Sequence, residues 1–412
     1  PLSGRVRVDA CKNSVLPLMA AALLTPEPVV LVGAPPLSDV HKMAELLLSL
    51  GAQVTQEEDH SLRIVAGKLH TREAPADLVH SFRASFLIAG PLLARFGRSR
   101  VPLPGGCQIG TRPVDLHLKG LEALGARVNL TRGYIGMTSP GLTGNSIYLD
   151  YPSVGGTENI LMAACLAEGK TVLLNAAREP EIEDLATMLR HMGARIEGAG
   201  TDTIVVEGVP QLSGVRYEPM GDRIEAGTFL FAAAVTRGDV RVEGVRPDHM
   251  KPVTAKLQEA GVTVEELPRG RGLHVAAQGR PQAVDIKTLP WPGFPTDLQA
   301  PAMVLAALAK GTSVITETVF ENRFMHVAEL ERMGAHIRIT DRVALIDGVA
   351  RLSGAMVSAT DLRAGAALVL AALAADGKTM VRDDGHIARG YVDFPGKLQA
   401  LGAPISLIEE QA

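Results

Sequence analysis

Hydrophobic and polar positions follow a pattern that recurs six times along the chain. In each copy, a stretch with helical spacing of apolar residues ends in Gly-Ala or Gly-Val, and residues typical of a strand follow. The copies are LLLSLGAQVT (46–55), LEALGARVNL (121–130), MLRHMGARIE (188–197), KLQEAGVTVE (256–265), ELERMGAHIR (329–338) and KLQALGAPIS (397–406). A glycine at the end of a helix favours a positive φ before the chain turns into a strand. We expect that conformation at Gly51, Gly125, Gly193, Gly261, Gly334 and Gly402, which lie about 70 residues apart.

The rest of each copy repeats as well. A stretch rich in alanine and leucine, such as VLPLMAAALL or APAMVLAALAKG, is followed by a short β-branched segment, such as VVLVG or TSVITE. The first is apolar almost all round and predicts a buried helix, whereas the helix before each glycine has a polar face and should lie outside. Each copy therefore predicts roughly helix–strand–helix–strand, with an added hairpin in some.

Six copies in 412 residues form two groups of three. The pattern predicts an α/β protein with a break near residues 217–222, and residues 1–11 read as a strand that completes the second group. The expected domains are 12–220 and 1–11 plus 221–412. The cleft between two such domains is the expected ligand site. The alternative is a duplicated scaffold without an active cleft.

Composition narrows the function classes. Hydrophobic residues make up 46% of the chain and the net charge is −4, which argues against disorder and against a nucleic-acid partner. The chain has three cysteines, a small and odd number that argues against a disulfide scaffold. No apolar run reaches about 18 residues, which argues against a membrane span. The first residues contain no apolar core of a signal peptide. We therefore expect a cytoplasmic protein, no membrane association and no obligate protein partner. The chain has no dinucleotide fingerprint, phosphate-binding loop or metal-ligand spacing, so neither a cofactor nor a metal is expected.

One glycine-rich loop, PGGCQIGTRPVDLH (104–117), contains a candidate reactive thiol. Arg112 follows Cys107, and a nearby cation lowers the pKa of a thiol and raises its reactivity. A lone cysteine can also be a small buried side chain, which is our interpretation of Cys165 in its alanine-rich helix.

Isolated cations stand where loops meet helices in several copies. They are Lys12, beside Asn13, and Arg83, Arg323, Arg363 and Arg389. Singly each is most simply a solvated side chain, but together they could bind a small ligand that carries both a carboxylate and a phosphate. Among the acids, Asp297 precedes an alanine-rich helix, where it could cap the helix or act as a base on a substrate hydroxyl.

Ten segments in this order resemble the family of UDP-N-acetylglucosamine enolpyruvyl transferases over nearly the whole chain. They are KNSVLP (12–17), RAS (83–85), PGGCQIGTRPVDLH (104–117), SVGGTENI (153–160), NAAREPEIED (175–184), DRIEAGTF (222–229), FPTDLQA (294–300), TETVFENRFMHV (316–327), TDLRAGAALVLA (360–371) and HIARGY (386–391). The resemblance implies two inverted α/β-barrel domains, each of three repeated units, with the active site in the cleft between them. It implies phosphoenolpyruvate and UDP-N-acetylglucosamine as substrates.

The resemblance also implies roles for residues. Cys107 is implied as the general acid on phosphoenolpyruvate and the thiol that fosfomycin alkylates, and Asp297 as the base that faces the sugar C3 hydroxyl. The implied phosphoenolpyruvate clamp is Lys12, Arg112 and Arg389, with Asn13 beside it and Arg323 and Arg363 as further cations. The implied UDP-sugar contacts are Arg83, Arg112, Pro113, Val114, Asp115, Leu116, Tyr151, Pro152, Ser153, Val154, Asp297 and Val319. Cys11 adds a second thiol next to Lys12.

The implied reaction releases phosphate by addition and elimination, and it is the first committed step of peptidoglycan synthesis. Two alternatives stay open at this point: an enolpyruvyl transferase of the shikimate pathway, and a UDP-sugar-binding paralogue without catalytic activity.

Overall fold

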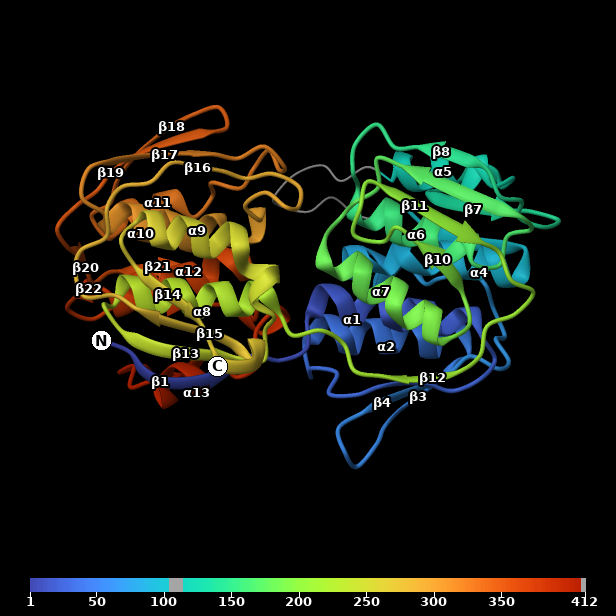
Figure 1. Ribbon diagram of the computed structural model, residues 1–412, viewed down its shortest axis with the longest axis horizontal. Coiled ribbons are helices and arrows are strands. Elements are labelled where there is room, and N and C mark those ends of the chain that lie inside the picture. The colour runs from blue at the N-terminus through green and yellow to red at the C-terminus, as the bar shows by residue number, and fades with distance from the viewer. Residues whose placement is uncertain (104–113, 409–412) are drawn as a thin grey trace. The chain divides into compact units, whose positions relative to one another are not determined.

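The chain divides into two compact units (Figure 1). The computed structural model describes residues 1–103 and 114–408. One unit, here the C-terminal unit, combines Pro1–Asp9 with the residues from Gly221 onward, and the other, the N-terminal unit, extends from Ala10 to Met220. Each unit has its own buried hydrophobic residues.

The N-terminal unit is mixed α/β. Its helices are α1 (Lys12–Ala21), η1 (Ala22–Leu24), α2 (Ser38–Leu50), α3 (Ala76–Ser81), η2 (Arg83–Ile88), α4 (Ala89–Phe96), α5 (Asp115–Ala123), α6 (Val154–Ala164) and α7 (Pro180–His191). Its strands are β2 (Val29–Leu31), β3 (Gln53–Gln56), β4 (Leu62–Val65), β5 (Arg98–Pro102), β6 (Arg127–Thr131), β7 (Tyr134–Thr138), β8 (Ser146–Tyr148), β9 (Lys170–Leu174), β10 (Arg195–Glu197), β11 (Thr203–Glu207) and β12 (Val215–Tyr217).

The C-terminal unit has the same character. Its helices are α8 (Arg223–Val235), η3 (Pro247–Met250), α9 (Lys251–Glu259), η4 (Pro268–Gly270), η5 (Thr296–Leu298), α10 (Gln299–Leu308), α11 (Val327–Arg332), α12 (Leu362–Leu373), η6 (Ile387–Arg389) and α13 (Phe394–Ala400). Its strands are β1 (Ser3–Arg7), β13 (Asp239–Glu243), β14 (Thr263–Glu266), β15 (Gly272–Ala276), β16 (Ile286–Lys287), β17 (Thr312–Thr316), β18 (His336–Thr340), β19 (Val343–Asp347), β20 (Leu352–Ser353), β21 (Met356–Ser358), β22 (Ala375–Asp376) and β23 (Met380–Arg382).

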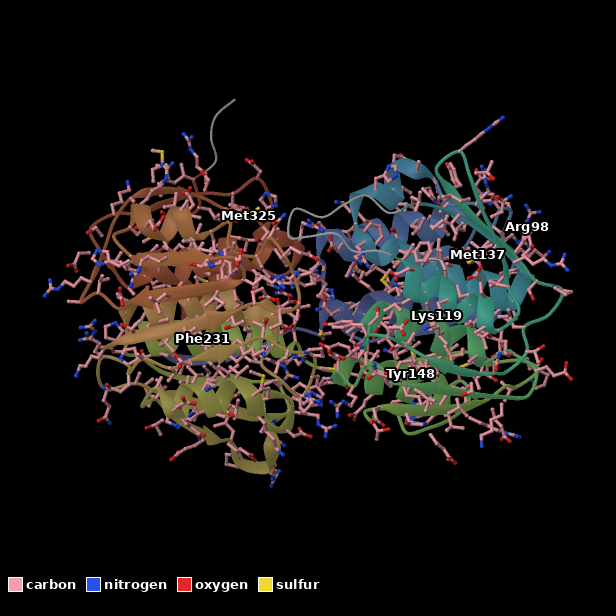
Figure 2. The ribbon with its side chains drawn as sticks, turned by 90° about the horizontal axis from the view of Figure 1, so that it is seen from above. Arg98, Lys119, Met137, Tyr148, Phe231 and Met325 are labelled. Carbon is pink, nitrogen blue, oxygen red and sulfur yellow. The ribbon has the colours of Figure 1, made fainter. Side chains whose placement is uncertain are left out.

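The alanine-rich stretches form the buried helices that the sequence predicts. In the C-terminal unit α8, α10 and α12 pack against one another, and every residue of α8 and α10 is buried. Small alanine side chains let such helices approach closely, while Phe231 and other large residues fill the remaining volume (Figure 2). Polar side chains at the ends of these helices, where the loops begin, are therefore held by a rigid support.

The same sheet recurs around each unit. In β16-β17-β19-β18 the first two strands are parallel and the last two form an antiparallel hairpin, and β1-β13-β15-β14, β12-β2-β4-β3 and β8-β9-β11-β10 repeat that order. The hairpin expected in some copies is thus present in these four sheets. Strand β8 is the outer strand of its sheet, and its residue Tyr148 is 56% exposed (Figure 2).

The six glycines adopt the predicted conformation. Their φ values lie between 85° and 104°, in the left-handed region that other residues rarely adopt. At Gly51 the surroundings add a second requirement, because a Cβ there would lie 2.8 Å from the backbone nitrogen of His70.

Two further predictions have different outcomes. The first residues form β1, which pairs in parallel with β13 as expected. The strand expected after Gly402 is wrong, because residues 403–408 form no strand. Pro404 lacks the N–H that a ladder needs.

The outer helices largely show the expected polar face, and α7 is the exception. In α2 the buried residues lie on one side, whereas α7 buries most of its positions, including Glu181 and Asp184. Within residues 1–103 and 114–408, no helix is long and apolar enough to span a bilayer.

Candidate functional site

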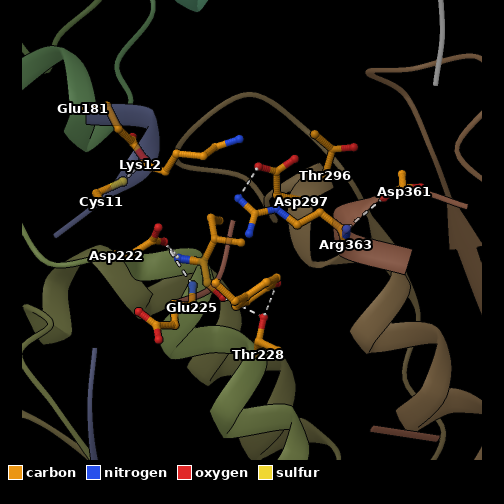
Figure 3. Close-up of polar contacts among 12 residues, drawn as sticks. Cys11, Lys12, Glu181, Asp222, Glu225, Thr228, Thr296, Asp297, Asp361 and Arg363 are labelled. Carbon is orange, nitrogen blue, oxygen red and sulfur yellow. Dashed lines mark hydrogen bonds and ion pairs between the residues drawn. The ribbon is translucent and has the colours of Figure 1, made fainter. Parts of the chain in front are cut away.

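The side chain of Asp297 is held by two arginines in the C-terminal unit. It accepts a hydrogen bond from Arg323 Nη2 at 2.7 Å. It accepts another from Arg363 Nη2 at 3.3 Å (Figure 3). Asp297 lies in η5, directly before Leu298, the N-cap residue of α10. Both guanidinium groups are almost fully buried, while the carboxylate is 24% exposed. The arrangement presents a fixed carboxylate to solvent with positive charge behind it.

Arg363 owes its position to the start of α12. Asp361 caps that helix by accepting from the backbone N–H groups of Arg363 and Ala364. The Arg363 guanidinium lies 5.3 Å from the centre of the Tyr391 ring, and the Tyr391 hydroxyl lies 3.0 Å from Thr228 Oγ1. Burial opposes the charge on Arg363, but Tyr391, Asp297 and Asp222 outweigh it, so the pKa of this guanidinium is raised.

Arg323 is fixed from another direction. Its Nη1 donates to Thr296 Oγ1 at 2.9 Å, and the Thr296 hydroxyl lies 3.0 Å from Oε2 of the buried Glu317. Glu317 follows β17, and its other oxygen accepts from the backbone N–H of Val319 at 2.9 Å. The structure therefore brings together Asp297, Arg323 and Arg363, and it links Val319 to them through Glu317 and Thr296. Arg389 ends η6, two residues before Tyr391.

In the N-terminal unit Lys12 begins α1. Its side chain is 10% exposed, and Nζ lies 3.2 Å from Asp39 Oδ2. Asn13 follows it in the first turn. The Cys11 thiol lies 3.7 Å from Glu181 Oε1, and Cys11 is fully buried (Figure 3).

Seven of the residues expected to contact the UDP-sugar, Val114–Leu116 and Tyr151–Val154, lie at two helix starts in the same unit. Val114 is the N-cap of α5, and Asp115 and Leu116 are its first residues. Tyr151 and Pro152 lead into α6, which begins at Val154 and whose N-cap Ser153 accepts from the Gly156 N–H at 3.1 Å. The two helix starts lie close together, because a Cβ added to Gly156 would lie 3.6 Å from Leu116 Cβ.

His117 joins this group, although the sequence analysis gave it no role. It is 4% exposed, its ring meets Phe86 edge-on with centroids 5.2 Å apart, and Asn159 Nδ2 lies 3.0 Å from its Nδ1. Burial first, and then the charge of Arg83, lower the pKa of His117 to about 3, so the ring is neutral. Arg83 begins η2 and is half-buried.

Cys107, Arg112 and Pro113 lie outside the described residues. The predictions for these three residues therefore stay predictions.

Sequence reasoning missed the residues that hold the charged groups in place. Thr228, Thr296, Glu317 and Tyr391 lie within segments that the resemblance quotes, but their types and spacing carry no signal of their own.

Three comparisons place the chain among known proteins. Residues 1–398 match the family model of EPSP synthase (3-phosphoshikimate 1-carboxyvinyltransferase). The chain is 55% identical over 409 residues to UDP-N-acetylglucosamine 1-carboxyvinyltransferase 2 of Carboxydothermus hydrogenoformans, covering 99% of this chain and 97% of that protein. It is 53% identical over 412 residues to UDP-N-acetylglucosamine 1-carboxyvinyltransferase 1 of Staphylococcus aureus strain MRSA252, covering 99% and 97%.

Solved structures agree with this placement. The enolpyruvyl transferase NikO from Streptomyces tendae superposes with a TM-score of 0.87 at 29% identity, covering 98% of this chain and 95% of that one. EPSP synthase from Acinetobacter baumannii, at 20% identity, shares the fold with a TM-score of 0.73 over 97% of this chain and 95% of its own. The predicted α/β fold of two repeat-built domains is confirmed, and the chain belongs to the family of UDP-N-acetylglucosamine 1-carboxyvinyltransferases, transferase enzymes within the larger EPSP synthase family.

Proposed function

We propose that this protein transfers the enolpyruvyl group of phosphoenolpyruvate to the C3 hydroxyl of UDP-N-acetylglucosamine and releases phosphate. The observation that carries the proposal is the partly exposed carboxylate of Asp297, fixed by the buried guanidinium groups of Arg323 and Arg363. Identity of 52 to 55% over nearly the full length to proteins named for this activity supports the choice of acceptor.

The chemistry needs an acid, a base and cations. Protonation of the methylene carbon of phosphoenolpyruvate makes the neighbouring carbon electrophilic, and the acceptor oxygen attacks it as Asp297 takes the hydroxyl proton. The tetrahedral intermediate then loses phosphate from that carbon and a proton from the methyl group, which restores the double bond. We assign the acid to Cys107, on the basis of its glycine-rich loop and the nearby Arg112.

Cations hold the two anionic groups of phosphoenolpyruvate through these steps. We assign this role to Lys12, Arg112 and Arg389, with Asn13 beside them. The buried start of α1 supports the assignment of Lys12, because a lysine with 10% of its side chain exposed and an ion pair to Asp39 is held in one orientation.

The acceptor nucleotide is assigned to the two helix starts of the N-terminal unit. Backbone N–H groups at helix N-termini favour phosphate, and the starts of α5 and α6 lie side by side there. We assign binding to Arg83, to Arg112 through Leu116 and to Tyr151 through Val154, with Val319 and Asp297 as contacts in the C-terminal unit.

Phosphate release tests the proposal. The full chain is incubated with both substrates, then with each alone, and inorganic phosphate is measured. Release that requires both substrates and stops with fosfomycin supports the assignment, and absence of release with both substrates contradicts it.

A pair of cysteine variants tests the assignment of the thiol. We expect Cys107→Ser to lose turnover or fosfomycin alkylation, and Cys11→Ser to lose neither, since Cys11 is fully buried. The opposite pattern contradicts the assignment of the acid to Cys107.

The two alternatives are tested by the same assay. Shikimate 3-phosphate in place of the UDP-sugar distinguishes the shikimate-pathway enzyme, whose solved relative shares only 20% identity with this chain. A binding paralogue would bind UDP-N-acetylglucosamine in calorimetry and release no phosphate. The activity would place the protein in the cytoplasm, at the first committed step of peptidoglycan synthesis.

A further inference from the structure

We propose that Thr296 and Glu317 are positioning residues that set Arg323 against Asp297, an inference that rests on the proposed role of Asp297. Neither residue contacts the reacting atoms of the proposed reaction. They act through the guanidinium group that lies between Thr296 and the carboxylate of Asp297.

Glu317 determines where the hydrogen of the Thr296 hydroxyl points. The Glu317 side chain is 1% exposed, and an ionised carboxylate only accepts hydrogen bonds. At 3.0 Å from Oε2, the Thr296 hydroxyl must therefore point its hydrogen at Glu317. Its lone pairs then face Arg323 Nη1, which donates to them at 2.9 Å.

Arg323 is consequently held at both ends of its guanidinium fork. Nη1 is bound to Thr296 and Nη2 to Asp297 Oδ1 at 2.7 Å, while the group lies 5.2 Å from the centre of the Phe320 ring. Because a guanidinium is rigid and planar, fixing one nitrogen fixes the direction of the other. The Thr296 hydroxyl thus sets, through Arg323, the position of Oδ1 of Asp297, while Arg363 holds the other oxygen.

Glu317 also anchors the neighbouring loop. Its Oε1 accepts from the backbone N–H groups of Val319 at 2.9 Å and Phe320 at 3.2 Å, and from the hydroxyl of Thr288 at 2.9 Å. Two groups assigned to the acceptor sugar, Asp297 and Val319, therefore depend on one buried carboxylate. This common anchor explains why a carboxylate is kept at a position without access to solvent.

The decisive variant is Thr296→Val, which keeps the shape of the side chain and removes the hydroxyl. A misplacement of about 1 Å in a catalytic group can lower a rate about 100-fold, so we expect kcat for phosphate release to fall ~10- to 100-fold. We expect the Kd for UDP-N-acetylglucosamine, measured by calorimetry, to stay within about 3-fold, because most of its contacts are assigned to the N-terminal unit.

Two further variants separate positioning from general destabilisation. Thr296→Ser restores the hydroxyl and should restore most of the turnover. The matched control is Thr312→Val in β17, which removes an exposed hydroxyl that binds Asp347 at 2.7 Å and should leave kcat unchanged.

Glu317→Gln tests the direction of the hydrogen bond. The glutamine oxygen can serve the backbone N–H groups of Val319 and Phe320, but its NH₂ group then faces Thr296 as a donor. The Thr296 hydroxyl hydrogen must turn away from this position, so we expect kcat to fall while thermal melting shows a folded protein. If this variant does not fold, Thr296→Val alone decides the question.

Native kcat in Thr296→Val overturns the inference, as does equal loss of kcat in Thr296→Val and Thr296→Ser. These outcomes differ from failure of the proposed function, in which the unaltered chain releases no phosphate from the two substrates.

Discussion

The guanidinium group of Arg363 lies 5.3 Å from the centre of the Tyr391 ring, and both side chains are buried. A cation over an aromatic face is stabilised by about 2 kcal/mol when it is desolvated. The same ring carries a hydroxyl 3.0 Å from Thr228 Oγ1. Ring and hydroxyl therefore stabilise the unit in separable ways.

Two Tyr391 variants separate these contributions. We expect Tyr391→Phe to lower the free energy of unfolding by ~1–2 kcal/mol, because the hydrogen bonds of the buried hydroxyl to Thr228 and Arg363 are lost and the ring stays. Tyr391→Leu should lower it by ~3 kcal/mol, since the cation also loses its aromatic partner and a cavity forms. Urea unfolding of the full chain measures both. Equal losses in the two variants contradict a role for the ring.

Removing the carboxylate of Asp297 should lower the free energy of unfolding, because two buried arginines then lose their shared negative partner. In Asp297→Ala they face each other without their shared carboxylate, and we expect a loss of up to ~3 kcal/mol of unfolding free energy, less than for a fully buried pair because Asp297 is 24% exposed. Arg323→Met on the Asp297→Ala background should recover part of that loss. Additive effects of the two substitutions would show that the charges do not interact.

The stability of the C-terminal unit should fall between about pH 5 and pH 8 through Glu225. Burial raises the pKa of Glu225 from 4.5 to about 7, with the charge of Asp222 adding to it and Lys397 opposing it. The folded state therefore binds a proton that the unfolded state releases, so this contribution is complete below pH 4.5 and lost as the pH rises through about 7. A shift of this size corresponds to about 3 kcal/mol.

A pH series of urea unfolding curves measures this effect, with Glu225→Gln as the comparison. Glutamine cannot ionise, so the decline between pH 5 and pH 8 should be smaller in that variant. An unchanged decline would assign it to other groups.

Two glycines with the same backbone conformation should respond differently to alanine. Gly193 has a φ of 104° and nothing within 4 Å of an added Cβ, so Gly193→Ala should cost ~1 kcal/mol of unfolding free energy through backbone strain alone. Gly51 has a φ of 103°, but its Cβ would meet the His70 backbone nitrogen at 2.8 Å, and we expect ~1–3 kcal/mol more. Thermal or urea unfolding measures the difference, and equal costs contradict the steric argument.

Much of the fold follows from local chemistry. Periodicity identifies the buried helices, and the glycine at each helix end predicts the positive φ that Gly51 and Gly193 adopt. The absence of a strand in residues 403–408 shows the limit of repetition, because a related motif forms a strand only where a partner strand lies beside it. The local sequence pattern does not show whether such a partner strand lies beside it.

The candidate site is predicted less completely. The resemblance selects Asp297, Arg323 and Arg363, which the structure brings together, but the sequence alone cannot decide between a cap and a base for Asp297. The partners that fix these charges, such as Thr296 and Glu317, are common residue types separated by 21 positions. Their pairing arises from tertiary packing, which no spacing rule along the chain encodes.

The parallel pairing of β1 with β13 determines how the protein can be divided. A fragment that starts at Gly221 lacks the edge strand of one sheet, so we expect it to be poorly soluble when produced alone. The backbone N–H of Ser3 donates to Leu401 O at 2.9 Å, so the opening strand lies beside the last helix. A rearranged gene that begins at Gly221 and appends residues 1–9 through a short linker should therefore yield an independently folding half.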